Sequence, residues 1–180
     1  GCEISEGAYD ESFRHAITKM STLHFAAAEP YQKRFIQLGE QSEKVFNVGA
    51  VGLDHIQRTQ FRTLDELKEI YDFNFSKPYF LITYHPETNL KDEDVTPLFN
   101  ALRQCSDVNF VFSYPNADNG NTEIVKEMLA LQAELPERVL LVKSFGIQNY
   151  LSVLKYSVAM VGNSSSGLSE APALQVPTVN

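Results

Sequence analysis

The 180-residue sequence contains no tryptophan and only two cysteines, Cys2 and Cys105. Two cysteines so far apart supply neither the ligand spacing of a zinc site nor a disulfide framework. Reduced thiols of this kind are typical of cytoplasmic proteins. The sequence also lacks an apolar run long enough to span a membrane and lacks a visible secretory signal. It therefore predicts a cytoplasmic protein that is not bound to a membrane and that carries no metal ion or other cofactor.

Positive charge is scarce as well. Lys and Arg together number 15, against 23 Asp and Glu, which gives a net charge of −8. A surface of this charge is a poor partner for a nucleic-acid backbone or an anionic membrane. A local anion site stays open, because main-chain amides do not enter a charge count. The hydrophobic fraction of 43% is enough to build a core, and the length fits one domain, alone or with a piece of another.

Short apolar segments alternate with segments of helical periodicity through most of the chain. Strands are predicted at residues 23–28, 45–48, 79–84, 109–114, 139–142, 158–161 and 178–179. Helices are predicted at residues 8–20, 30–38, 63–73, 92–105, 121–135, 148–155 and 165–174. This alternation indicates a Rossmann-like α/β fold, in which helices cover both faces of a parallel sheet. Gly49 and Gly52 form the candidate hinge between two parts of the chain.

Polar residues follow four of the predicted strands. These residues are His85, Asn116, Ser144 and Asn163. Ligands of open α/β sheets bind outside the carboxyl ends of the strands. The sequence therefore predicts a ligand-binding rim built by four separate strands.

The segment Gly162–Gly167, with the sequence GNSSSG, lies between a predicted strand and a predicted helix. Its small residues allow close approach of a ligand, and its hydroxyls and amides suit phosphate oxygens. The alternative is a turn that uses serine as an ordinary helix cap, but three serines exceed what one cap needs. Glu170 follows one turn later, where it would either accept bonds from a ribose or complement the helix dipole.

Two further rim residues each have two interpretations. Pro86 fixes the exit of the chain after His85, whose ring would pair with a diphosphate or transfer a proton near neutral pH. The alternative is an ordinary loop histidine. Asn116 lies in a loop rich in Pro, Asn and Gly, where it would either read a base or serve the turn itself.

Acidic residues gather near the start of the chain. Glu3, Asp10 and Glu11 precede Arg14, and Asp10 shares a helix face with Arg14. A solvated ion pair is the usual explanation of such spacing. Carboxylates at a cleft would instead work as acid and base, and the spacing alone leaves both interpretations open. We interpret the remaining histidines as structural.

Taken together, these segments resemble one family, the hydrolysing UDP-N-acetylglucosamine 2-epimerases. The resemblance lies in residues 3–7 and 10–19, in the His-Pro pair at His85, in the Pro-Asn pair at Pro115, and in Gly162–Gly167 with Glu170. It covers essentially the whole chain, and the segment RHAITK at residues 14–19 resembles the sialic-acid branch.

The resemblance implies a two-domain, glycosyltransferase-B-like fold with the active site between the domains. Residues 1–49 would be the end of the first domain, and residues 50–180 the UDP-binding domain without its C-terminal tail. The chain begins without Met and ends on an apolar segment, so we expect both ends to be cuts, with most of the N-terminal domain missing. The family removes the C2 proton of a UDP-sugar and eliminates UDP, and water then adds to release N-acetylmannosamine. It commonly forms homo-oligomers.

The resemblance also implies roles for individual residues. Glu3 and Asp10 match catalytic acids, and His85 matches a catalytic or phosphate-binding histidine. The residues that match UDP contacts are Asn116, on the uridine side, Ser164, Ser165 and Glu170. Supporting roles fall to Glu11 and Arg14. Cys2 stands where the family has glycine, which affects the close approach beside Glu3.

Other functions stay open at this point. One is a non-hydrolysing epimerase or a glycosyltransferase on the same fold, and another is a hydrolysing epimerase for a UDP-linked diacetamido sugar. A third, of a different class, is a non-catalytic nucleotide-binding module. We expect this chain by itself to bind UDP without catalysis, because catalysis needs the whole constellation of groups at once.

Overall fold

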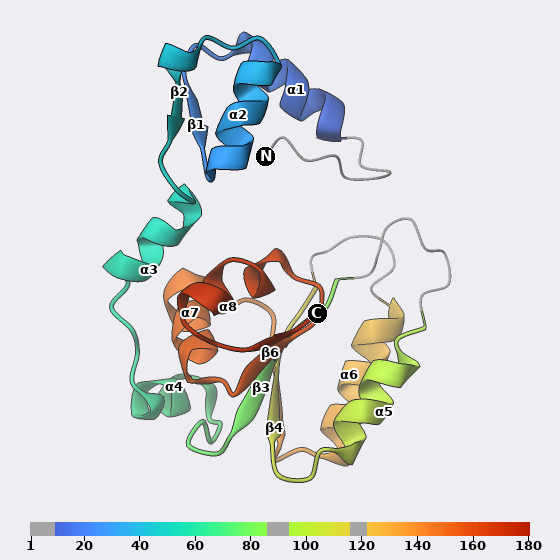
Figure 1. Ribbon diagram of the computed structural model, residues 1–180. Helices are drawn as coiled ribbons and strands as arrows, with labels where there is room; N and C mark the ends of the chain where they lie inside the picture. Colours follow the sequence, from blue (N-terminus) through green and yellow to red (C-terminus); the bar gives the residue numbers. More distant parts are fainter. Residues whose placement is uncertain (1–9, 86–93, 116–121) are drawn as a thin grey trace. The chain divides into compact units, whose positions relative to one another are not determined.

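The computed structural model describes residues 10–85, 94–115 and 122–180 (Figure 1). The chain divides into two compact units, residues 1–55 and 56–180, and each unit is described on its own.

The first unit holds a small parallel sheet and two helices. Its elements are α1 (Asp10–Met20), β1 (His24–Ala26), α2 (Glu29–Gln37), η1 (Ser42–Lys44), β2 (Val45–Asn47) and η2 (Val51–Leu53), and α3 (Asp54–Arg58) crosses into the second unit. The strand β1 pairs with β2, with His24 opposite Val45. Pro30 lies in the first turn of α2, and Gly39, with a φ of 93°, follows its end. Both features agree with the predicted helix boundaries.

The second unit is a five-stranded parallel sheet with helices on both faces. Its elements are α4 (Leu64–Tyr71), β3 (Tyr79–Thr83), α5 (Thr96–Gln104), β4 (Asn109–Ser113), α6 (Thr122–Glu134), β5 (Val139–Val142), α7 (Gly146–Tyr156), β6 (Ala159–Val161), η3 (Ser165–Gly167), α8 (Glu170–Ala173) and β7 (Thr178–Val179). The strand order is β5-β4-β3-β6-β7, and every neighbouring pair is parallel. The predicted Rossmann-like fold is therefore confirmed.

Each face of this sheet has its own core. Leu81 and Met160 pack with residues of α4, α7 and α8 on one face. Ile82 and Phe110 pack with residues of α5 and α6 on the other. Because successive side chains of a strand point to opposite faces, a run of apolar residues such as β3 serves both cores at once. Figure 1 shows α5 and α6 on one side of the sheet and α7 and α8 on the other.

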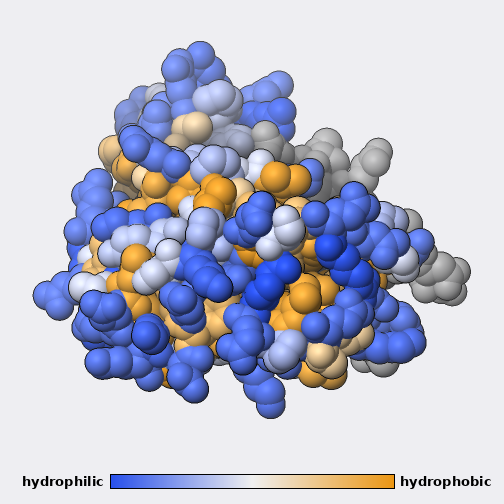
Figure 2. All heavy atoms as spheres, turned by 90° about the horizontal axis from the view of Figure 1, so that it is seen from below, coloured by the Kyte–Doolittle hydropathy of each residue, from blue (hydrophilic) through white to orange (hydrophobic). Residues whose placement is uncertain are grey.

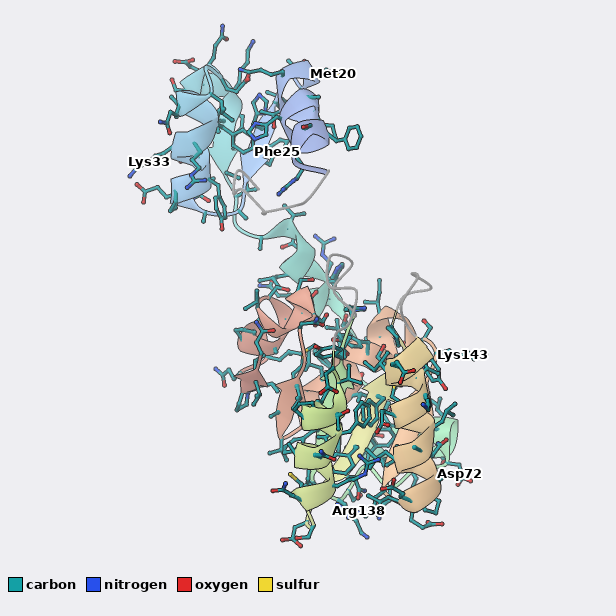
Figure 3. The ribbon with its side chains drawn as sticks, turned by 90° about the vertical axis from the view of Figure 1, so that its right-hand side faces the viewer. Met20, Phe25, Lys33, Asp72, Arg138 and Lys143 are labelled. Atoms are coloured by element: carbon teal, nitrogen blue, oxygen red, sulfur yellow. The ribbon has the colours of Figure 1, made fainter. Side chains whose placement is uncertain are left out.

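Arg138 links several segments at the end of the sheet where the strands begin. Arg138 precedes β5, donates to the main-chain oxygens of Cys105 and Val108, and lies over the Phe110 ring. It thus ties together the end at which the strands begin. Lys143 lies at the other end of β5 (Figure 3).

Hydrophilic residues cover much of the surface in Figure 2, with hydrophobic residues in groups between them. No helix of the described ranges is long and apolar enough to cross a membrane.

Two predicted helices differ from the structure. The helix predicted at 92–105 is observed from Thr96, so that Pro97 falls in its first turn. The helix predicted at 165–174 is wrong as a single element, because η3 and the four-residue α8 replace it. Pro172 explains the division, since it has no N–H to donate to Leu168 and its ring would collide with that carbonyl in a continuous helix. A start at Glu170 places Pro172 in the first turn instead.

Candidate functional site

The strand order reverses between β3 and β6. The chain runs from β3 through β4 to β5 on one side of the sheet, and then returns to place β6 and β7 on the other side of β3. Such a reversal leaves the two loops that follow β3 and β6 next to each other, and ligands of open α/β sheets bind in the crevice there. Residues 84–85 follow β3 and residues 162–169 follow β6.

The structure brings most of the predicted rim together. His85 follows β3, Ser144 follows β5, and Asn163 with Ser164 follows β6. Because all five strands are parallel, these residues lie at the same edge of the sheet. Asn116, which was predicted to complete the rim after β4, lies outside the described residues.

Gly162 brings the loop after β6 into close contact with β3. Its φ is 126°, and a Cβ at this position would lie 2.1 Å from the main-chain oxygen of Thr83. Its own N–H donates to the Val179 oxygen at 2.9 Å, which ties the loop to β7 as well. Only glycine satisfies both the backbone angle and the contact.

Asn163 then links the two loops directly. Its Oδ1 accepts from the His85 N–H at 2.7 Å, and its Nδ2 donates to the His85 main-chain oxygen at 2.6 Å. One side-chain amide thus satisfies both main-chain polar groups of a residue that lies 78 positions away. The sequence predicts Asn163 on the rim, but it carries no signal of this contact, which depends on the reversed strand order.

The three serines of the GNSSSG segment have three different environments. The Ser164 hydroxyl accepts from the Ser166 N–H at 3.3 Å and caps η3. Ser165 is exposed, whereas Ser166 is buried. The main-chain amides of Ser164 and Ser165 have no hydrogen-bond partner within the described part of the chain. Ser164, which is half-buried, and the exposed Ser165 therefore have amide donors available for a ligand, whereas Ser166 is buried.

Three hydroxyl groups, those of Thr83, Tyr150 and Ser166, lie close together beneath the loop after β6. Ser166 is 9% exposed and Thr83 6% exposed, and neither hydroxyl completes a hydrogen bond with a described residue. Both nevertheless lie close to the Tyr150 phenol. Burial raises the pKa of Tyr150, the Ser166 and Thr83 hydroxyls partly lower it, and the Glu170 carboxylate raises it. Tyr150 was not predicted, because an aromatic residue in the middle of an amphipathic helix carries no signal of such a role.

Glu170 is half-buried at the start of α8. The Ser169 hydroxyl donates to its carboxylate and also lies 3.0 Å from the Ser165 main-chain oxygen. The Thr178 hydroxyl donates to the Gly167 oxygen at 3.0 Å and holds the other end of the loop. The serines and Glu170 therefore belong to one hydrogen-bonded structure.

The remaining predicted residues come from the first unit. Glu3 lies outside the described residues, as do the side chains of Asp10 and Glu11, whose main chain begins α1. Arg14 is half-buried in α1, and its main-chain oxygen accepts from the Thr18 hydroxyl at 2.9 Å. The predicted pairing of Asp10 with Arg14 stays a prediction. Within the described ranges, no group of three or more His, Cys, Asp or Glu side chains could hold a metal ion.

Comparison with known sequences identifies relatives for the whole chain. The family described as UDP-N-acetylglucosamine 2-epimerase matches residues 1–180. The hydrolyzing GDP/UDP-N,N'-diacetylbacillosamine 2-epimerase of Campylobacter jejuni is 38% identical over 184 residues, which cover 100% of this chain and 48% of the relative. The polysialic acid biosynthesis protein P7 of Escherichia coli is 38% identical, with 100% and 46% covered. The UDP-N-acetylglucosamine 2-epimerase of Neisseria meningitidis is 33% identical, with 100% and 47% covered.

Solved structures share the fold. The UDP-GlcNAc 2-epimerase of N. meningitidis bound to UDP-GlcNAc has a TM-score of 0.74 at 18% identity, with 95% of this chain and 47% of that chain covered. A Staphylococcus aureus MnaA–UDP co-structure has a TM-score of 0.71 at 19% identity, with 94% and 46% covered. At such identities the likeness concerns the fold alone. The chain spans about half the length of the curated relatives that it matches.

Proposed function

We propose that this chain, which belongs to the UDP-N-acetylglucosamine 2-epimerase family, supplies the UDP-binding part of a hydrolysing epimerase. In the proposed reaction, the C2 proton of UDP-GlcNAc is removed and the C1–O bond to UDP breaks, which yields UDP and a glycal. Water then adds its oxygen to C1, and a proton returns to C2 from the opposite face. The products are UDP and N-acetylmannosamine.

The observation that carries this proposal is the position of Ser164 and Ser165 at the strand-order reversal. Two main-chain amides with no described partner and two hydroxyls offer donors to the oxygens of a diphosphate. A hydrogen bond to a charged group contributes roughly 1.5–3 kcal/mol. Ser164 and Ser165 thus suit the diphosphate, and the Ser166 N–H keeps the Ser164 side chain in the cap of η3.

The neighbouring groups suit the rest of the nucleotide. We assign Glu170, whose carboxylate accepts from the Ser169 hydroxyl, to the ribose hydroxyls. We assign Asn116 to the uridine side. His85 lies across the reversal from the serines and is assigned to the diphosphate or to proton transfer.

Catalysis in this proposal also requires the first unit. We assign Glu3 and Asp10 as catalytic acids, with Glu11 and Arg14 in support, and residues 1–49 as the end of a first domain. An elimination needs acid, base and leaving-group contacts held together closely. We therefore expect that this chain binds UDP but does not turn over UDP-GlcNAc, whereas the whole protein does.

The names of two relatives favour the hydrolysing branch. The relatives from C. jejuni and Legionella pneumophila, at 38% and 33% identity, are both named as hydrolyzing 2-epimerases. The relative from E. coli is named for polysialic acid biosynthesis, which supports a role in making a sialic acid or a related sugar acid. Because both hydrolyzing relatives carry names with N,N'-diacetylbacillosamine, a UDP-diacetamido sugar is the second candidate substrate. We further propose that the whole protein is a cytoplasmic homo-oligomer.

Product analysis tests the proposal. The whole protein is incubated separately with UDP-GlcNAc and UDP-N,N'-diacetylbacillosamine, and the products are followed by NMR. Free UDP and a free 2-epimeric sugar support hydrolysis, and the faster substrate identifies the sugar. A product that keeps its UDP would contradict the hydrolysing assignment.

Calorimetry with this chain tests the site itself. The double change Ser164→Ala and Ser165→Ala should weaken UDP binding by at least about tenfold.

A further inference from the structure

Asn163 makes its two hydrogen bonds at a place where the regular sheet has ended. The last paired residues of β3 and β6 are Ile82 and Val161. Beyond them, Gly162 brings the loops into contact, and among the described residues the ladder between β3 and β6 does not extend to residues 84 and 85. The Asn163 side chain connects the two loops here, because it bonds both the N–H and the main-chain oxygen of His85.

We infer that Asn163 is a positioning residue. It fixes the main chain of His85 to the serine loop, residues 162–167, and thereby sets the position of the His85 ring at the site. This inference rests on the proposed function, in which His85 and the serines contact the same UDP. The two segments come from strands on opposite sides of the reversal, so nothing in the local sequence of either one determines their spacing. A rigid link between them orders both before the ligand arrives.

The exposure of Asn163 supports a role in the site. A buried side-chain amide must find partners merely to offset the cost of its burial. Asn163 is exposed and both of its polar atoms could bond to water, yet both are directed at one residue. Two hydrogen bonds from one planar group fix orientation as well as distance.

A double-mutant cycle on UDP affinity tests the inference. Calorimetry compares the unchanged chain with Asn163→Ala, His85→Ala and the double variant. If Asn163 acts through the His85 ring, Asn163→Ala should weaken UDP binding roughly tenfold alone and less than about twofold when the ring is already absent. Equal losses in both backgrounds would overturn the inference, because Asn163 would then act on the ligand or on the serine loop without His85.

A second measurement needs no ligand. Asn163→Ala should raise the hydrogen-exchange rate of the His85 amide, followed by NMR, by about tenfold or more. Asn74→Ala is the matched control, because Asn74 also accepts a main-chain N–H, that of Ser76 at 3.0 Å, at an exposed position before β3. The control should leave both the His85 amide and UDP affinity unchanged.

The two measurements separate the possible failures. If the unchanged chain does not bind UDP, the proposed function falls, and the link is judged by hydrogen exchange alone. A His85 amide that exchanges equally fast with and without the Asn163 side chain would overturn the inference whatever the UDP affinity.

Discussion

The two units of the chain use the same parallel β-α-β arrangement with very different completeness. In the second unit, helices cover both faces of a five-stranded sheet, and residues such as Phe99 and Phe110 are fully buried. In the first unit, Ala26 and Val45 are buried, but Phe25 and Phe46 stack on each other while 61% and 43% exposed. A sheet with two strands and one covered face is marginally stable.

The helices of the first unit repeat this difference. Phe13, Ile17 and Met20 share one face of α1 and are 68%, 62% and 85% exposed. Figure 3 shows Met20 at the end of α1 and Lys33 on α2. A group of exposed apolar side chains of this size is typical of an interaction surface. The comparison teaches that one sequence pattern yields a self-sufficient core only when enough strands are present to bury both faces.

The largest expected effect concerns catalysis and tests whether both units serve one site. In the whole protein, Asp10→Asn from the first unit and His85→Ala from the second should each lower kcat by about 10²–10⁴ if each acts as an acid or base in the way proposed above. UDP release from UDP-GlcNAc measures the rate. Lys33→Ala, which changes an exposed side chain that pairs with Glu29, is the control. Full activity of the Asp10 variant would contradict the catalytic assignment of Asp10.

The next effect compares the two cores directly. Phe99 stacks on Phe112 with their ring centroids 5.9 Å apart and is fully buried, so Phe99→Ala should lower the free energy of unfolding of the second unit by about 3–5 kcal/mol. Phe25→Ala, which removes an exposed ring, should lower that of the first unit by less than about 1.5 kcal/mol. A denaturant titration in which unfolding is monitored by hydrogen exchange assigns each loss of stability to its unit. Similar losses at both positions would contradict the difference between the cores.

A glycine in each unit provides a smaller and sharper contrast. Gly162→Ala should destabilise the second unit by about 1–3 kcal/mol or more, because the new methyl group meets the Thr83 oxygen and the φ of 126° is strained for alanine. Gly52→Ala should be close to neutral, since a Cβ there has no atom within 4 Å. Thermal melting of the two variants checks this. A neutral Gly162→Ala would show that the contact between β3 and the serine loop can relax.

The smallest effect is a pH dependence in the first unit. The Lys19 ammonium, by its hydrogen bond, holds the pKa of Glu40 below its ordinary value of 4.5, although burial opposes this shift; Glu40 also bonds to His24. A lowered folded-state pKa stabilises the folded state above about pH 4.5, and this stabilisation disappears as the pH falls through the lower folded value.

Circular dichroism between pH 3 and pH 6 (roughly the window of this titration) measures the effect. The Glu40→Gln variant should lose part of the acid dependence. Glu123→Gln, which removes an exposed carboxylate of the second unit, is the control and should leave the dependence intact. An unchanged profile for Glu40→Gln would show that other groups govern the acid response.

Much of the fold followed from local pattern. The strands at 139–142 and 178–179 agree with the structure, and the helix predicted from residue 63 begins with a capping box, in which Thr63 and Glu66 exchange two hydrogen bonds. The short helical segments α3, η1 and η2 were not predicted, because three to five residues are too few to show a period. The helix predicted at 165–174 failed where Pro172 outweighed apolar periodicity.

The candidate site divides in the same way. The sequence by itself determined that polar residues follow apolar strands, and hence that His85, Ser144 and Ser164 share one edge of a parallel sheet. Only the tertiary structure decided that β6 returns to the side of β3, that Gly162 contacts Thr83, that Asn163 holds His85, and that the three serines have separate environments. The physical reason is range: hydrophobic period and turn chemistry act over a few neighbouring residues, whereas contacts between residues 78 positions apart depend on how the whole sheet packs.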